Sequence, residues 1–163
     1  MDRAPEPGNT EERDLLLGWL AFHRDALAAN CEGLTADQLV EASAPPSDLS
    51  LLGLVRHMTE MEHAYLVFAL TGGQFSGVYF TDDAPDADIA DLSAGKAEGS
   101  MARWHDERAR ADQLLSSTRA LESVSPGNRF SVRWNLIKVI QEYARHNGHA
   151  DLIRERIDGA TGE

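Results

Sequence analysis

The sequence predicts an all-α protein, an up-down four-helix bundle with long middle connections. Apolar residues recur at spacings of three and four over four long segments, which is the period of an amphipathic helix. The connections carry the Gly, Pro and Asn residues that interrupt helices, and no segment has the alternating pattern of a strand. A bundle buries the apolar faces of such helices and can hold metal sites between them.

The chain of 163 residues is long enough for one domain with its own core. We expect residues 1–9 to be a disordered lead-in, because Pro5, Pro7 and Gly8 interrupt any regular pattern there. The bundle should then form a single domain over residues 10–160.

Two long helices are expected in the first half of the chain. The first should run from about residue 11 to residue 31, with Gly33 as its stop. A short capped helical turn is expected at 35–40. Ser50, which follows a pair of prolines, can cap a second long helix that reaches about residue 70.

The second half should contain a long loop and two further helices. Residues 72–88 are rich in Gly, Pro, Asp and Ser, and we interpret them as a candidate substrate lid. A third helix is expected at 89–118, and a fourth from its cap Ser131 to its stop Gly159. The apolar face expected for the fourth helix includes Trp134, Ile137, Ile140, Leu152 and Ile157.

Charge and cysteine content narrow the functional classes. The 27 acidic and 15 basic residues give a formal charge of −12, which repels phosphate backbones and anionic lipids, so we expect no nucleic-acid or membrane partner. No run approaches the roughly 18 apolar residues of a membrane span. The lone Cys31 cannot form an internal disulfide, and with no signal-peptide pattern this favours a cytoplasmic protein.

Glu142 and His146 form the most informative pair in the chain. Residues four apart lie about 40° around a helix and roughly 6 Å along it, so a carboxylate and an imidazole can converge on one ion. The best candidate for a third ligand is His57, which lies in the second apolar-periodic segment. Three protein ligands with one open position are typical of a catalytic metal site.

A salt bridge is the alternative interpretation of Glu142, because Arg145 or Arg154 could satisfy a buried carboxylate without any metal. His149 lies three residues after His146, but helical rise places it about 10 Å beyond Glu142, too far to share one ion with both. We assign His149 to the surroundings of the ligands or to the pocket wall. Arg145 and Asp151 are expected either to be solvated or to lie around the ligands, where they could orient an imidazole.

Two other chemistries fit the sequence less well. Glu60 and His63 form a Glu-x-x-His element of the kind used by di-iron bundles, but the equivalent offset from Glu142 falls on a cation, Arg145. Cys31 has no adjacent base for nucleophilic catalysis. The histidines outside the proposed ligand set and its surroundings are expected to be surface or boundary side chains: His23, His63 and His105.

Three stretches carry a resemblance to a known family. These are Leu-Val-Arg-His57, then Arg133-Trp134, and Glu142-Tyr-Ala-Arg-His-Asn-Gly-His-Ala-Asp-Leu-Ile-Arg-Glu155. With them the chain resembles the DinB/YfiT-like superfamily of metal-binding four-helix bundles from about Glu11 to Gly159. It is most similar to a bacterial branch with the motif Ala-Arg-His-x-Gly-His-Ala-Asp.

The resemblance implies one divalent metal ion, often zinc or nickel, held by three side chains, and frequently a homodimer. Much of the superfamily has two histidines four apart on the last helix, and Glu142 stands at the first of these positions. With a glutamate at this position, the chain also resembles the mycothiol-dependent maleylpyruvate isomerase. Lys138 stands where related sequences commonly have a histidine.

Metal-assisted chemistry of low-molecular-weight thiols recurs among such relatives. A divalent ion with an open position lowers the pKa of a bound thiol. We therefore expect a metal-dependent thiol S-transferase that acts on a small electrophile. Arginine far outnumbers lysine and alanine is abundant, as in high-GC genomes, which makes mycothiol the expected thiol. A metal-dependent hydrolase and a non-enzymatic metal- or ligand-binding stress-response protein remain open alternatives.

Overall fold

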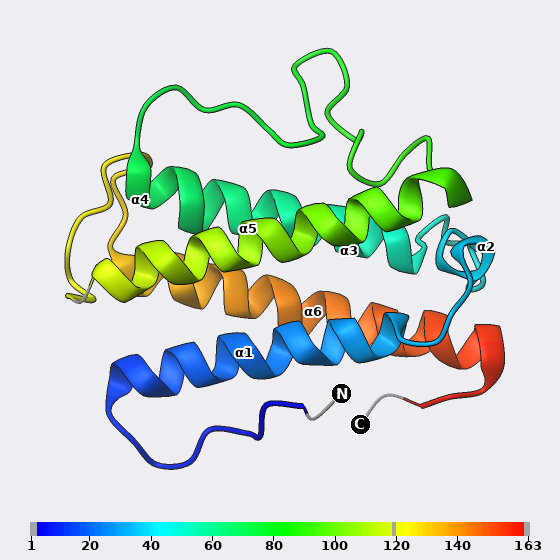
Figure 1. The fold of residues 1–163 in the computed structure, drawn as a ribbon, viewed down its shortest axis with the longest axis horizontal. Helices are drawn as coiled ribbons and strands as arrows, with labels where there is room; N and C mark the ends of the chain where they lie inside the picture. Colours follow the sequence, from blue (N-terminus) through cyan, green and yellow to red (C-terminus); the bar gives the residue numbers. More distant parts are fainter. Residues whose placement is uncertain (1–2, 119, 162–163) are drawn as a thin grey trace.

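The structure is a computed structural model that describes residues 3–118 and 120–161, and these residues form helices and connections without any β-strand. Long helical segments lie side by side, as Figure 1 shows. The helical elements, in chain order, are α1 (Glu12–Cys31), α2 (Ala36–Leu39), α3 (Leu51–Glu62), the π-helix η1 (His63–Phe68), α4 (Ala69–Thr71), the 3₁₀-helix η2 (Ala94–Lys96), α5 (Ala97–Ser117) and α6 (Val132–Asp158). The predicted all-α class is confirmed.

The helices pack mainly as two pairs, α1 with α6 and α3 with α5, and α3 also contacts α6. Figure 1 shows that α1 and α6 run in one direction, whereas α3 and α5 both run in the other. The up-down order that we expected therefore holds from α1 to α3 and from α5 to α6, but not between α3 and α5. The reason is the loop 72–93, which carries the chain back along the length of the helices before α5 begins.

The caps predicted for α2, α3 and α6 form as expected, whereas α1 begins after Glu11 without a side-chain cap. The Ser50 and Ser131 hydroxyls accept hydrogen bonds from the backbone N–H groups of Gly53 and Trp134, which satisfies free donors at the starts of α3 and α6. Thr35 makes a capping box with Gln38 at α2. Gly159 ends α6 in the left-handed conformation, with a φ of 79°.

The third long helix begins later than predicted, because residues 89–93 are not helical. Asp91 has a positive φ of 50°, and Ser93 is extended before η2. The Lys96 ammonium donates to the carbonyl of Asp91 and stabilises this turn. Residues 89–93 therefore extend the loop, and α5 begins at Ala97.

The buried face of α6 matches the predicted one only in part, because Ile140 and Ile157 pack against the core but the other three predicted residues do not. Trp134, Ile137 and Leu152 are 39%, 50% and 60% exposed. The helix has apolar residues on two sides, and the sequence period alone does not say which side faces the core. The hydrophobic residues of α6 that are buried are Val132, Leu136, Val139, Tyr143, Ala150 and Ile153.

The segment before α1 lies along that helix (Figure 1). The backbone N–H of Ala4 donates to the Asp25 carboxylate at 3.0 Å. A Cβ at Gly18 would lie 2.7 Å from the Pro7 Cβ, so this glycine allows the close approach. The predicted lead-in thus lacks regular secondary structure but contacts α1 over its described part, residues 3–9. Within the described residues, no helix is both long and apolar enough to cross a membrane.

Candidate metal centre

The structure brings His57, Glu142 and His146 together where α3 packs against α6. One nitrogen from each histidine and one carboxylate oxygen all lie within 4.8 Å of one another. Their side chains are only 24%, 14% and 16% exposed, so the cluster is half-buried at the helix contact. Residues about ninety positions apart in sequence thus form one set of three donor atoms.

The helical spacing of Glu142 and His146 produces the convergence that the sequence predicted. The Glu142 Oε2 and His146 Nε2 atoms are 3.4 Å apart. The His57 and His146 rings meet edge to face, with centroids 4.7 Å apart and an interplanar angle of 67°. Two imidazoles and one carboxylate are a donor set that catalytic zinc sites use, and a site with three protein ligands leaves a position open.

Asp88, from the loop 72–93, holds the His57 ring. The His57 Nδ1 atom lies 2.8 Å from the Asp88 Oδ2 atom, and the Asp88 carboxylate also accepts from the N–H of Ile89. A carboxylate accepts a hydrogen bond only from a protonated Nδ1, which leaves the Nε2 lone pair of His57 available to an ion. Sequence analysis did not find Asp88, because a loop acidic residue 31 positions after His57 gives no periodic signal.

Lys138 is the cation that pairs with Glu142. Its Nζ atom donates to Glu142 Oε1 one helical turn away and lies 5.7 Å from the centroid of the Tyr65 ring. The salt-bridge alternative named Arg145 or Arg154, but Arg154 instead pairs with Asp158, and Arg145 is exposed. The lysine thus neutralises the carboxylate and leaves Oε2 directed toward His146.

The electrostatics of the cluster keep its groups in states that suit metal binding. Burial, and after it the charge of the neighbouring His57, lower the pKa of His146 to about 4, although Glu142 opposes the shift. Burial raises the pKa of Glu142, but the hydrogen bond and charge of Lys138 outweigh this, and the net pKa is lowered. A neutral imidazole and an ionised carboxylate are therefore both present at neutral pH.

The three residues assigned around the ligands lie in different places. The His149 Nδ1 atom is 3.4 Å from the His146 Nδ1 atom, so this side chain is adjacent to a predicted ligand. Asp151 accepts a hydrogen bond from Asn30 at 2.8 Å, and Arg145 is exposed on α6. Asp151 therefore does not orient a ligand imidazole, whereas Asp88 of the loop 72–93 does contact one, that of His57.

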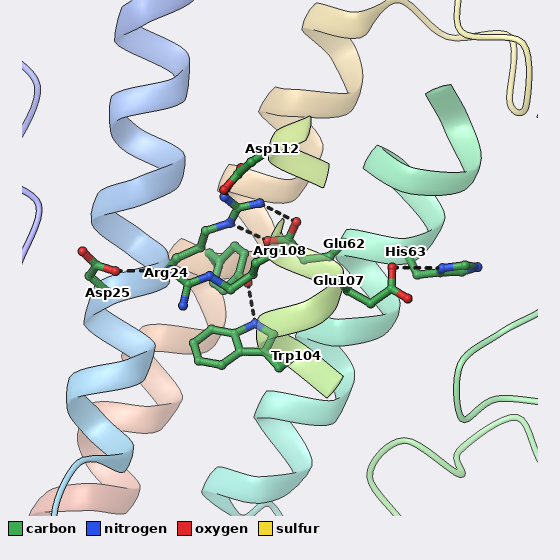
Figure 2. A network of polar contacts seen from close by, with 9 residues as sticks. Arg24, Asp25, Glu62, His63, Trp104, Glu107, Arg108 and Asp112 are labelled. Carbon is green, nitrogen blue, oxygen red and sulfur yellow. Dashed lines mark hydrogen bonds and ion pairs between the residues drawn. The ribbon is translucent and has the colours of Figure 1, made fainter. Parts of the chain in front are cut away.

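A buried polar network next to the cluster fixes how the helices meet (Figure 2). Arg24 of α1 donates to both oxygens of Glu62 of α3 at 2.7 Å, and the Tyr143 hydroxyl of α6 donates to the same carboxylate at 2.9 Å. Trp104 of α5 donates to the Tyr143 oxygen at 2.8 Å. Since Tyr143 follows Glu142 directly, this network fixes α6 against α3 beside the candidate ligands.

The residues considered for a di-iron centre and for nucleophilic catalysis make other contacts. The Glu60 carboxylate accepts the backbone N–H groups of residues 78–80 at 2.5–3.0 Å and so holds the loop. His63, expected to be a surface or boundary side chain, is 16% exposed and lies 3.3 Å from the Glu107 carboxylate. Cys31 is buried, which raises its pKa to about 12 and leaves a protonated thiol.

An apolar pocket of about 230 Å³ adjoins the cluster. His57 and Asp88 form one part of its wall, and Phe75, Phe80 and Pro85 of the loop form another. The loop that we interpreted as a substrate lid therefore covers a hollow that includes a candidate ligand. Such a pocket can hold an apolar group beside His57.

Fold and cluster together define a class: all-helical proteins that place a His/Glu donor set between facing helices. The model of the mycothiol S-transferase family matches residues 15–159. The chain belongs to this family, which is DinB/YfiT-like. No curated protein matches the chain.

Proposed function

We propose that the protein is a metal-dependent mycothiol S-transferase and that His57, Glu142 and His146 hold its divalent metal ion, zinc or nickel. The observation that carries the proposal is the convergence of these three donors within 4.8 Å in a member of the mycothiol S-transferase family. The bundle and its metal ligands would then follow the pattern of the superfamily that the sequence resembles. A homodimer remains a prediction.

The residues around the site support this assignment. Two imidazoles and a carboxylate suit zinc and nickel better than magnesium or calcium, which prefer oxygen donors. A divalent ion with an open position supplies Lewis-acid chemistry and presents a bound thiol as its thiolate. Asp88 orients His57, and Lys138 keeps Glu142 ionised.

The pocket beside His57 gives the electrophile a place next to the thiol. Its walls contain the apolar side chains of Met61, Phe75, Phe80 and Pro85, which suit an apolar group. In the transfer, the thiolate sulfur forms a bond to an electrophilic carbon, and either a leaving group departs or a double bond accepts the electron pair. We therefore expect an apolar or aromatic electrophile.

The experiment is a thiol-transfer assay with mycothiol and a fluorogenic alkylating electrophile. Metal-free protein should be inactive, and added zinc or nickel should restore the product signal. His146→Ala should remain inactive after metal addition, whereas His105→Ala, which changes an exposed histidine of α5, should behave as wild type. Hydrolysis of ester or amide probes without thiol transfer would instead support the hydrolase alternative, since the same open position can bind water.

A further inference from the structure

A hollow with three cationic side chains lies between the loop 72–93 and the start of α5. Its volume is about 630 Å³, and its walls include Arg56, Tyr79, Lys96, Ser100 and Arg103. It shares no lining residue with the pocket beside His57. The whole chain carries a formal charge of −12, so three cations among the lining residues of one hollow contrast with its composition.

Arg56 is the buried anchor of this hollow. The residue is 7% exposed, and its guanidinium lies over the Tyr79 ring with its Cζ atom 4.1 Å from the ring centroid. The Nη2 atom donates to the Ala87 carbonyl at 2.5 Å, but the buried Nε and Nη1 atoms have no protein acceptor within the described residues. A buried charged donor is costly unless something pairs with it.

The Tyr79 hydroxyl resembles these two nitrogen atoms of Arg56 in its lack of a partner. Its oxygen is buried and has no hydrogen-bond partner among the described residues. Two nitrogen atoms of the Arg56 guanidinium and the Tyr79 hydroxyl, all from residues that line the hollow, therefore lack a partner among the described residues. An oxyanion would satisfy both residues, and a small shift of the Tyr79 side chain would open the guanidinium edge to it.

The two other cations are only partly neutralised. Arg103 pairs with Glu107 at 2.8 Å, but its side chain is 46% exposed and Glu107 is shared with His63. Lys96 lies 3.2 Å from the carboxylate of Asp91, which is fully exposed. Each cation retains N–H groups for a further acceptor, because a guanidinium has five and an ammonium three.

The hollow continues along α5. A second hollow of about 310 Å³ shares Val78 and Arg103 with the first and adds Arg110 to the cationic wall. Val78 and the Tyr79 ring supply apolar surface beside the cations. The combined shape suits a molecule with a carbon skeleton and an anionic end better than it suits a bare ion.

We propose that this hollow is a binding site for a small organic oxyanion, whose carboxylate or phosphate group is held by Arg56, Arg103 and the Tyr79 hydroxyl. The planar fork of arginine matches both groups, since each offers two or more acceptor oxygens. The site depends neither on the metal ligands nor on thiol transfer. It gives a function to a buried arginine that otherwise has no carboxylate partner among residues 3–118 and 120–161.

The test is an NMR titration of the amide resonances of the full chain, made metal-free with a chelator. Sodium phosphate and sodium benzoate are added separately, with sodium chloride at matched ionic strength as the reference. Saturable shifts of the Tyr79 and Ser100 amides are expected with at least one of the two anions. The anion that produces these shifts, whether phosphate, benzoate or both, identifies the group that the site prefers. Shifts no larger than those with chloride would overturn the proposal.

Variants then test the residues themselves. Arg103→Gln should weaken binding at least about fivefold and Arg56→Lys at least about tenfold, because each loses guanidinium hydrogen bonds to the anion. Arg129→Gln, an exposed change in the connection before α6, should bind as wild type. If Arg56→Lys fails to fold, Arg103→Gln decides, and unchanged affinity in that variant would refute the assignment. Loss of zinc binding or of transfer activity would leave these results unaffected.

Discussion

Two polar clusters connect α3 and α6, and they differ in how completely their groups are paired. In the network around Glu62, the side chains of Arg24 and Glu62 are 4% and 0% exposed, and both carboxylate oxygens accept hydrogen bonds (Figure 2). In the candidate metal centre, the three donor side chains are 14–24% exposed, and the Glu142 Oε2 and His146 Nε2 atoms are 3.4 Å apart. The same two helices thus carry one paired cluster and one open cluster.

The difference indicates separate roles. A buried ion pair whose hydrogen bonds are all made leaves no position for a ligand, so it acts on how the helices meet. Two imidazoles and a carboxylate whose donor atoms all lie within 4.8 Å of one another have lone pairs to offer to an ion. Substitutions in the first cluster should therefore reduce stability, and substitutions in the second should reduce ligand binding.

Glu62→Ala should have the largest effect on folding. It leaves the Arg24 guanidinium buried without its main partner, which costs about 3–5 kcal/mol of unfolding free energy. Urea denaturation of the metal-free protein measures this loss, with Glu155→Ala, an exposed change on α6, as the control. A loss below about 1 kcal/mol would show that the network does not fix the helices.

Asp88→Asn should weaken zinc binding by about 10- to 100-fold, because the amide no longer accepts the His57 Nδ1–H as a carboxylate does. Calorimetric titration with zinc provides the affinity. Asp83→Asn removes an exposed charge from the same loop and should leave the affinity unchanged. Equal affinities in wild type and Asp88→Asn would mean that the loop does not contribute to the site.

Lys138→Met should change the zinc affinity in the opposite direction and strengthen binding by about fivefold. The substitution removes a positive charge beside the ion and frees the Oε1 atom of Glu142. The same titration measures the change, and Arg129→Met, which removes an exposed cation from the connection before α6, serves as the control. Weaker binding in Lys138→Met would show that the ammonium holds Glu142 in the binding geometry.

Cys31→Ser should have the smallest effect and leave thiol transfer within about twofold of wild type. The thiol is buried and its pKa is raised to about 12, so it stays protonated near neutral pH. Native protein should also react slowly with a thiol reagent, and urea should expose the group. Loss of transfer in a folded Cys31→Ser protein would place this thiol in the reaction.

The sequence predicted the helices better than their faces or directions. Ser50, Ser131 and Gly159 are local signals, and they mark helix ends correctly because capping depends on a few neighbouring residues. The start of α5 was wrong by eight residues, since Asp91 and Ser93 turn the chain through contacts with Lys96. Which side of α6 faces the core depends on its neighbours, and no local pattern contains that information.

The candidate site shows the same difference between local signals, which the sequence contains, and contacts that depend on the fold. Glu142 and His146 could be found because one helix sets their spacing, and His57 because it is a histidine in an apolar helix. Asp88 and the Lys138 contact were missed. The first depends on how a 22-residue loop, 72–93, folds back over α3, and the second on which of several cations reaches the carboxylate.

Zinc titration of wild type, His146→Ala and His105→Ala, all prepared metal-free, is the most direct test of the central claim. The account predicts about one ion per wild-type chain, similar binding in His105→Ala, and at least a tenfold loss in His146→Ala with little change in unfolding free energy. Equal zinc affinity in wild type and His146→Ala would contradict it. The open cluster between α3 and α6 would then be a structural contact like the network around Glu62.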